Sequence, residues 1–450
     1  MNARRSRSLL DPLFTTDRMR AIFSDHGRLQ AMLDFEAALA RGEARIGAIP
    51  QGAGAAIAEQ CRADFFDVDA LGAGAAQSGN TAIPLVKELT ARVAARDRDA
   101  ARYVHWGATS QDAMDTGLVL QLREALVVLE SDLARLAAAL AALAQAHAAT
   151  PLAGRTWLQQ GPPVTLGLKA AGFLSAVERH RVRLGELKKR VLVLQFGGAV
   201  GTLAALGPRA GEVAAAVGGT LGLAVPDLPW HAQRDRVAEV ATTLGLLVGT
   251  LGKLARDVSL LMQTEVGEVA EPSTSGRGGS STMPHKRNPV GCAVILAAAA
   301  RVPALASVML SAIVQEHERG LGGWHAEWET LPEICALAAG ALAQAIVIVE
   351  GLHVDAARMA KNLDLTQGLI LAEAVSIALA EKLGKAKAHE LVEEAAARSV
   401  AERLPLRDAL AADARVAAHL SAADLERLTD PARYLGEAEA LVARALARRS

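Results

Sequence analysis

The longest regular pattern of apolar residues lies between residues 113 and 150. Leucines recur there at spacings of three and four residues, which is the heptad seam of a helix that packs along its whole length. A helix of roughly 35 residues would be about 50 Å long, and Pro151 ends the pattern because proline does not continue a helix. The leucines of this seam are Leu118, Leu122, Leu126, Leu129, Leu133, Leu136, Leu140 and Leu143.

Four further stretches carry apolar residues at helical spacing. They cover residues 17–47, 235–269, 290–314 and 331–352, and Pro303 is expected to kink or divide the third. Rods this long and apolar cannot cover their own apolar faces. They therefore predict an elongated bundle that also packs against further copies of the chain.

The composition supports a helical protein. Apolar residues make up 51% of the 450 residues and aromatic residues only 3%, whereas sheets are enriched in β-branched and aromatic side chains. We predict an all-α fold with a central long-helix bundle at residues 113–361 and small helical domains at residues 1–112 and 362–450. Functional residues are expected on the polar, glycine-rich connections between rods. These connections are residues 103–116, 152–165, 195–207, 230–236, 276–291 and 315–329.

The charge balance excludes two classes of partner. The chain has 48 lysines and arginines against 49 acidic residues, so no net positive field exists to hold a nucleic acid or an anionic membrane. We expect no membrane span and no secretory signal, which predicts a cytoplasmic protein. Cys61, Cys292 and Cys335 are widely spaced and have no histidines at metal spacing, so we expect buried thiols and no metal.

The strongest signal for a functional site lies in residues 278–289, Gly-Gly-Ser-Ser-Thr-Met-Pro-His-Lys-Arg-Asn-Pro. Paired glycines let backbone amides approach an anion, and the hydroxyls and the lysine add hydrogen-bond donors. The final Asn-Pro pair turns the chain into the next helix. A solvated hinge between two helices is the plain alternative. The segment is not a Walker phosphate loop, because the G-x-x-x-x-G-K-[ST] spacing is absent.

This segment resembles the G-S-S-x-M-P-x-K-x-N signature of the fumarase/aspartase superfamily. Residues 105–112, His-Trp-Gly-Ala-Thr-Ser-Gln-Asp, are similar to the superfamily's H-x-G-x-T-S-x-D segment. Residues 198–202 are similar to its G-A-V-G-T turn, and residues 233–235 to its Q-R-D. The resemblance implies an all-α homotetramer with a five-helix central domain, no cofactor, and active sites that each combine loops from three subunits.

The resemblance also implies roles for single residues. Ser280 becomes the proton-transfer residue, and Lys286 with Asn288 binds a substrate carboxylate. A serine hydroxyl is a poor base unless its alkoxide is stabilised, which Lys286 and the amides of a closing loop would do. We expect Ser280, Lys286 and His105 to be catalytic. The expected substrate contacts are Thr109, Ser110, Gln111, Arg155, Trp157, Gln233, Ser281, Met283, Arg287, Asn288 and His317.

One departure from the superfamily pattern narrows the chemistry. Most relatives carry a histidine where this chain has Trp157, and that histidine protonates a leaving amine or handles a leaving hydroxyl. A carboxylate that leaves, or that attacks in the reverse direction, needs no such proton because its pKa is about 4. Trp157 therefore points to lactone chemistry.

The M-P-H-K-R-N-P motif also resembles that of adenylosuccinate lyases, which hold a nucleotide phosphate with an N-terminal Arg-Tyr pair. Leu13 and Phe14 stand at the matching positions, so a nucleotide substrate is disfavoured. The likeness is closer to the bacterial 3-carboxy-cis,cis-muconate cycloisomerase family, over residues 103–122, 154–159, 192–198 and 315–332. It implies lactonisation of a tricarboxylate in protocatechuate breakdown, by the β-ketoadipate route.

Two other hypotheses stay open at this point. One is an amine-releasing lyase of the same superfamily, such as an adenylosuccinate or argininosuccinate lyase. The other is an inactive helical scaffold, against which the intact set of Ser280, Lys286 and Asn288 argues. His285 is either a second acid–base group or a support for Lys286, and residues 317–319 either line the pocket or form an ion-paired loop.

Overall fold

A computed structural model of the chain describes residues 9–273, 278–279, 283 and 286–448. Within these ranges helices account for nearly all regular structure, which confirms the all-α prediction. The residues group into two compact units. Unit 1 contains Met1–Ala134, His180–Gly252 and Val294–Gln344, and unit 2 contains Arg135–Arg179, Lys253–Ala293 and Ala345–Ser450. The division into three domains at residues 112 and 361 stays a prediction.

Five long helices contribute residues to both units. Their leucine and alanine side chains are largely buried, and the seam leucines from Leu122 to Leu140 confirm the heptad pattern because all of them are buried. These helices are α7 (Ser110–Ala146), α8 (Leu166–Val191), α10 (Asp235–Leu261), α11 (Val290–Ser311) and α12 (Gly323–Glu350).

Three details of the predicted helices are wrong. The stretch 17–47 forms two helices, α2 (Asp17–Ile22) and α3 (Asp25–Ile46), because the Ser24 hydroxyl caps α3 by accepting a hydrogen bond from the Gly27 amide at 3.0 Å. Pro303 does not divide α11, which is one continuous helix, and the alternative of a kink at Pro303 stays a prediction. The predicted ends of the second and fourth rods also shift, since α10 stops at Leu261 and α12 already begins at Gly323.

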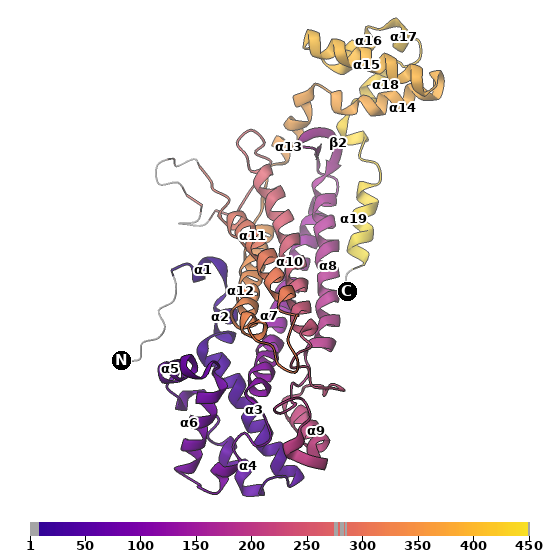
Figure 1. Ribbon diagram of the computed structural model, residues 1–450. Helices are drawn as coiled ribbons and strands as arrows, with labels where there is room; N and C mark the ends of the chain where they lie inside the picture. The colour runs from indigo at the N-terminus through magenta and orange to yellow at the C-terminus, as the bar shows by residue number, and fades with distance from the viewer. Residues whose placement is uncertain (1–8, 274–277, 280–282, 284–285, 449–450) are drawn as a thin grey trace. The chain divides into compact units, whose positions relative to one another are not determined.

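Unit 1 has its core around α3, which packs against α4 (Gln51–Ala58) and α9 (Ala210–Leu221) (Figure 1). Phe35 of α3 is fully buried and meets Phe196 edge-on, with 6.2 Å between ring centres. The other short elements of this unit are α1 (Asp11–Phe14), α5 (Val68–Ser78), α6 (Ala82–Ala94) and the 3-10 helices Ala63–Phe65, Ala100–Tyr103 and Ala204–Arg209.

Unit 2 contains two small antiparallel sheets that the sequence analysis did not predict. Strands β1 (Pro151–Thr156) and β2 (Gln159–Thr165) form a hairpin, and β3 (Val269–Ala270) pairs with β4 (His353–Val354). The C-terminal helices are α13 (Ala356–Leu363), α14 (Ala372–Leu383), α15 (Lys385–Glu402), α16 (Leu406–Ala411), α17 (Ala414–Ala417), α18 (Ala422–Leu428) and α19 (Ala438–Ala447), with 3-10 helices at Asp364–Thr366, Leu369–Leu371 and Pro431–Arg433. Helices α14 to α18 share a core that includes Leu391, Leu406 and Leu410 (Figure 1).

Helices α10, α11 and α12 are long and apolar enough to cross a membrane by length and composition. The expectation that no stretch reads as a membrane span is therefore wrong on that criterion, because the alanine and leucine of a packed bundle are as apolar as a lipid-facing helix. The fold buries 61% of the apolar window of α10 and 67% of that of α12, but only 33% of that of α11. Helix α11 thus leaves apolar surface uncovered by its own chain.

Candidate active site

A buried carboxylate at the start of α7 ties together three of the polar segments. Asp112 is fully buried, and its Oδ2 accepts hydrogen bonds from the amides of Thr109 (3.0 Å) and Gly198 (2.9 Å). Its Oδ1 accepts from the Gly197 amide (2.9 Å) and from Nε2 of His231 (2.8 Å). Charge-assisted hydrogen bonds of this kind are stronger than neutral ones. Residues far apart in the sequence therefore converge on one charge.

The two glycines that face Asp112 have no room for a side chain. Gly198 has a left-handed backbone (φ +67), and a Cβ there would lie 2.9 Å from the carbonyl oxygen of Gly107. A Cβ on Gly197 would lie 2.7 Å from Pro229 and 2.8 Å from the His231 ring. Only glycine permits this close approach. The start of the G-A-V-G-T turn is therefore a packing requirement of the fold.

His105 is held by a buried acid from another helix. Its Nδ1 donates to Oε1 of Glu36, a buried residue of α3, at 2.6 Å. Burial lowers the pKa of His105, but the charge and hydrogen bond of Glu36, together with the charge of Asp112, outweigh this effect and raise the pKa above its ordinary value. The ring therefore keeps a positive charge to higher pH than a free imidazole, which suits a ligand for a carboxylate.

A cavity of about 570 Å³ in unit 1 is lined by His231 and by two predicted substrate contacts, Gln233 and His317. Its volume lies within the range of small-molecule sites. Arg319 donates from Nη2 to the Thr109 hydroxyl at 2.9 Å. The segment that carries His317 is thereby joined to the segment that carries Thr109. Of the residues predicted in unit 1, the structure thus places Gln233 and His317 at the cavity, whereas His105, Thr109, Ser110 and Gln111 do not line it.

A buried ion network lies next to Gln233 in the sequence. The guanidinium of Arg234 is fully buried and donates to both oxygens of Asp115, at 2.7 and 3.0 Å. The same guanidinium donates to Glu327 of α12, with Nε at 2.9 Å from Oε1. Burial raises the pKa of Glu327 although the charge of Arg234 opposes this. A fixed Arg234 holds its neighbour Gln233 at the cavity.

Gln111 and Ser110 do not line the cavity. Gln111 is fully buried, and its amide nitrogen donates to Asp115 Oδ2 at 3.0 Å and to the His231 carbonyl oxygen at 2.9 Å. Ser110 is the first residue of α7 and is half-buried. Both stay predicted substrate contacts, although the amide of Gln111 already serves the fold.

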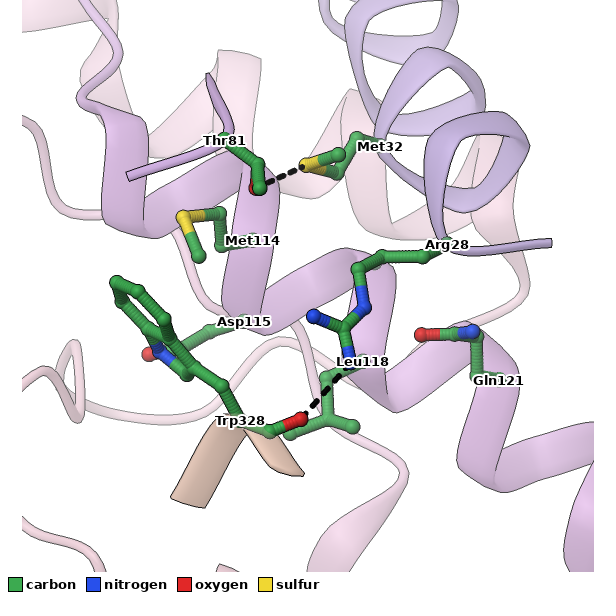
Figure 2. Close-up of a pocket in the computed structure, with 9 residues that line it drawn as sticks. Arg28, Met32, Thr81, Met114, Asp115, Leu118, Gln121 and Trp328 are labelled. Carbon is green, nitrogen blue, oxygen red and sulfur yellow. Dashed lines mark hydrogen bonds between the residues drawn. The ribbon is translucent and has the colours of Figure 1, made fainter. Parts of the chain in front are cut away.

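A second cavity of unit 1 is lined in part by Asp115 but is too small for substrate. Figure 2 shows Arg28 reaching across it, with Nη2 donating to the carbonyl oxygen of Trp328 at 2.8 Å. The volume is about 30 Å³, which holds about one water molecule. We therefore place no substrate there.

Two predicted contacts of unit 2 lie on the β1–β2 hairpin. Arg155 makes a two-pronged ion pair with Glu268, at 2.9 and 2.7 Å, and Glu268 is fully buried. Trp157 stands at the tip of the hairpin with 97% of its surface exposed. Both tip residues, Trp157 and Leu158, have left-handed backbones (φ +52 and +65), which large side chains adopt at a cost. The roles of Arg155 and Trp157 toward substrate stay predictions.

Residues near the two ends of the glycine- and serine-rich segment, 278–279 and 287–288, pair through their backbones. The Asn288 amide donates to the Gly278 carbonyl oxygen at 2.8 Å, and Gly279 bridges Arg287 in antiparallel fashion. Gly278 has φ +70, and a Cβ there would lie 2.8 Å from the Asn288 carbonyl oxygen, so glycine is required. Lys286, Arg287 and Met283 are exposed and Asn288 is half-buried. The predicted residues Ser280, Ser281 and His285 lie outside the described residues.

Sequence reasoning missed three residues of this arrangement. Glu36 sits in the middle of an amphipathic helix and matches no motif, and Arg319 was weighed only as one member of a polar triplet. His231 could have been found from its place two residues before the Q-R-D segment. Among the described residues no group of three or more histidine, cysteine, aspartate or glutamate side chains could hold a metal ion. Cys61, Cys292 and Cys335 are buried thiols outside any disulfide, as predicted.

The long-helix scaffold thus carries a cavity with the volume of a small-molecule site, lined by histidine, glutamine, arginine and carboxylate side chains. The sequence matches the lyase family over residues 13–304 and the C-terminal region of adenylosuccinate lyases over residues 368–445. The chain therefore belongs to the lyase family, the fumarase/aspartase superfamily that its motifs resemble.

Individual relatives are similar over nearly the whole chain. A 3-carboxy-cis,cis-muconate cycloisomerase of Pseudomonas aeruginosa is 64% identical, over 98% of this chain and 96% of its own. The crystal structure of the 3-carboxy-cis,cis-muconate lactonizing enzyme of Pseudomonas putida superposes with a TM-score of 0.94 at 59% identity, covering 98% of both chains. A nitrosuccinate lyase of Streptomyces davaonensis is 45% identical, over 97% of this chain and 94% of its own.

Proposed function

We propose that the chain catalyses the lactonisation of 3-carboxy-cis,cis-muconate to γ-carboxymuconolactone, in the β-ketoadipate route of protocatechuate breakdown. The observation that carries the proposal is the identity, over almost the full length, to an enzyme of that name. Coverage of this extent takes in the candidate site segments as well as the helices. The absence of a histidine at Trp157 agrees with a reaction in which a carboxylate is the attacking or leaving group.

The reaction forms one carbon–oxygen and one carbon–hydrogen bond. A carboxylate oxygen of the substrate adds to one carbon of a double bond, and the π electron pair moves through the neighbouring carbon into the carboxyl group that it carries. The enediolate that results takes a proton at that carbon. In our proposal Ser280 delivers the proton, while Lys286 and His105 stabilise the negative charge that builds up on the carboxyl oxygens.

In our proposal the site supplies positive charge locally, although the chain as a whole has no positive net charge. The substrate carries three carboxylates, and the formal net charge of the chain is −1. His105 and Arg319 in unit 1, and Lys286 and Arg287 in unit 2, are the cations we assign to the substrate. Electrostatic stabilisation of this kind acts on the transition state because the donors are in place before the charge develops.

Incubation of the purified protein with 3-carboxy-cis,cis-muconate tests the function. The muconate absorbance should disappear without added cofactor or metal, and NMR should show the lactone as the product. Dialysis against a chelator should leave the rate unchanged. Release of fumarate from adenylosuccinate or argininosuccinate, with no loss of the muconate, would favour the amine-releasing lyase instead. Failure with every dicarboxylate and tricarboxylate tested would favour an inactive scaffold.

We also propose a homotetramer whose active sites are shared between subunits. Two observations support it. Trp157 is a large apolar side chain that its own chain leaves exposed, on a turn with a costly backbone. Helix α11 is apolar, but its own chain buries only a third of its apolar window. Neighbouring copies that cover both surfaces would remove these two costs.

Complementation between inactive variants tests the sharing of sites. We expect Trp157→Ala and Ser280→Ala each to lose most of their activity alone, and mixed tetramers of the two to recover part of it. Recovery follows because some sites of a mixed tetramer take an intact residue 157 and an intact residue 280 from different subunits. Light scattering should give a mass of four chains. A monomeric mass with full activity would refute the proposal.

Two further assignments complete the proposal. We place the enzyme in the cytoplasm, with no nucleic acid or membrane partner, which fractionation of the source cells tests. We retain residues 1–112, 113–361 and 362–450 as its three domains. Limited proteolysis that cuts near residues 112 and 361 would support these boundaries.

A further inference from the structure

We propose that Glu36 is a positioning residue of the reaction: its buried carboxylate holds the His105 ring through Nδ1 and aims the opposite nitrogen, Nε2, at a substrate carboxylate. This inference rests on the proposed function, in which His105 contacts the substrate. Glu36 lies within α3 and outside every motif that connects the sequence to its superfamily.

The geometry fixes the ring from one side only. The Nδ1 to Oε1 distance is 2.6 Å, short enough for a charge-assisted hydrogen bond. The Glu36 side chain is 1% exposed, whereas the His105 side chain is 15% exposed. The acid is therefore sealed within the fold and the ring keeps an accessible part. His105 also has a left-handed backbone (φ +58), a conformation that persists where the surrounding structure holds it.

A second buried histidine–carboxylate pair in unit 1 shows what is particular about Glu36. Asp112 bonds to His231, but it shares its charge with the amides of Thr109, Gly197 and Gly198. For Glu36, Oε1 bonds to His105, and Oε2 has no hydrogen-bond partner among the described residues. The negative charge of Glu36 is therefore directed at His105 rather than divided among backbone amides.

Among the described residues, the charged groups that act on the His105 ring are two acids. Glu36 comes from α3 and Asp112 from the first turn of α7. Their attraction exceeds the opposite effect of burial, so the pKa of His105 lies above its ordinary value of 6.5. A ring charged in this way donates from both nitrogens. Nδ1 is used by Glu36, and Nε2–H remains for the substrate.

Glu43 provides a matched control on the same helix. It lies two turns beyond Glu36 and is fully buried, and neither oxygen has a hydrogen-bond partner among the described residues. Burial, and then repulsion from Glu36, raises the pKa of Glu43 to about 9. Glu43 is thus uncharged at neutral pH. Replacing Glu43 removes a buried carboxyl group but leaves in place the negative charges that act on His105.

Steady-state pH profiles of Glu36→Gln and Glu43→Gln form the first experiment. For Glu36→Gln we expect kcat/KM for the muconate to fall about 10- to 100-fold, mainly through KM, because one charge-assisted contact is weakened. The alkaline limb of its profile should move to lower pH, since His105 loses its proton earlier without the acid. Glu43→Gln should keep the wild-type limb. An unmoved limb in Glu36→Gln would overturn the proposal.

Deuterium exchange at the imidazole Cε1–H, read by mass spectrometry of peptides, titrates His105 in the ligand-free protein. Wild-type His105 should titrate above 6.5 and Glu36→Gln His105 lower. A wild-type value below 6.5 would overturn the proposal even if Glu36→Gln failed to fold. A shifted titration without turnover of the muconate would reject the proposed function and keep the pairing. Turnover of the muconate with an unshifted His105 titration would keep the proposed function and reject the pairing of Glu36 with His105.

Discussion

Replacing Ser280 by alanine is expected to lower kcat for the muconate by about 10²- to 10⁴-fold, the usual contribution of one positioned proton-transfer group. The substrate carbon still accepts the carboxylate in the variant, but the enediolate must take its proton from water. KM should change little, because the cations that bind the carboxylates remain. Stopped-assay kinetics on the purified variant, with circular dichroism and light scattering to show an intact assembly, measures the effect.

Ser273→Ala is the matched control for this variant. Ser273 is an exposed serine of the same connection between β3 and α11, and its loss should leave kcat within twofold. Ser281→Ala separates the two adjacent hydroxyls of the signature. If Ser281→Ala removed turnover and Ser280→Ala did not, proton transfer would belong to the second serine. Full activity in both variants would show that the segment does not transfer the proton.

Arg234→Leu is expected to destabilise the protein by about 3–5 kcal/mol, a large share of the free energy of unfolding of an ordinary domain. The change leaves Asp115 and Glu327 buried next to each other without the cation that both of them contact. Urea denaturation measures the cost. The activity of the folded fraction should fall as well, because Gln233 loses the anchor beside it.

The deficit of Arg234→Leu should shrink as the pH falls. The folded pKa of Glu327 is already raised by burial, and it rises further without Arg234. The folded state then binds more protons than the unfolded state, so stability is greatest below the unfolded pKa and is lost as the pH rises. We expect a smaller deficit at about pH 5.5 than at about pH 8. A deficit that grows in acid would contradict this account.

Two further variants separate charge burial from packing. Arg301→Leu removes an arginine that pairs with Glu333 at the surface, and it should cost less than about 1 kcal/mol because exposed ion pairs contribute little. Adding Glu327→Gln to Arg234→Leu should recover part of the lost stability, since one uncompensated charge disappears. No recovery would mean that the cavity left by the guanidinium, rather than the charges, sets the cost.

The long helices could be predicted because their apolar residues recur at a regular spacing. The start of α12 and the β1–β2 hairpin could not, because they depend on contacts with residues far away in the sequence. The seam of α7 repeats strictly enough to define the helix to within a few residues. The start of α12 was missed because Glu327 breaks its apolar pattern, and only the fold shows that Arg234 compensates this acid. The β1–β2 hairpin was missed because glycines and prolines interrupt it. It is held by distant partners such as Glu268.

Some residues of the candidate site could likewise be predicted from the sequence, and others could not. The motif segments around His105, Gln233 and Lys286 could be recognised because each is a continuous run of unusual residues. Glu36 could not, because a lone acid on an amphipathic helix predicts a solvated side chain. Its burial follows from how α3 packs against α4 and α9.

Asp112 holds three separate segments of the chain together by hydrogen bonds, and this limits how the site can be redesigned. Its bonds reach to the Gly197 amide 85 positions away and to His231 119 positions away. A peptide copied from any one of these stretches and grafted into another helical scaffold would therefore not keep its shape. Val200 and Leu228 also line the cavity, with side chains that are 55% and 76% exposed. Altered substrate range is best sought at these two positions, where variation leaves the carboxylate and its ligands untouched.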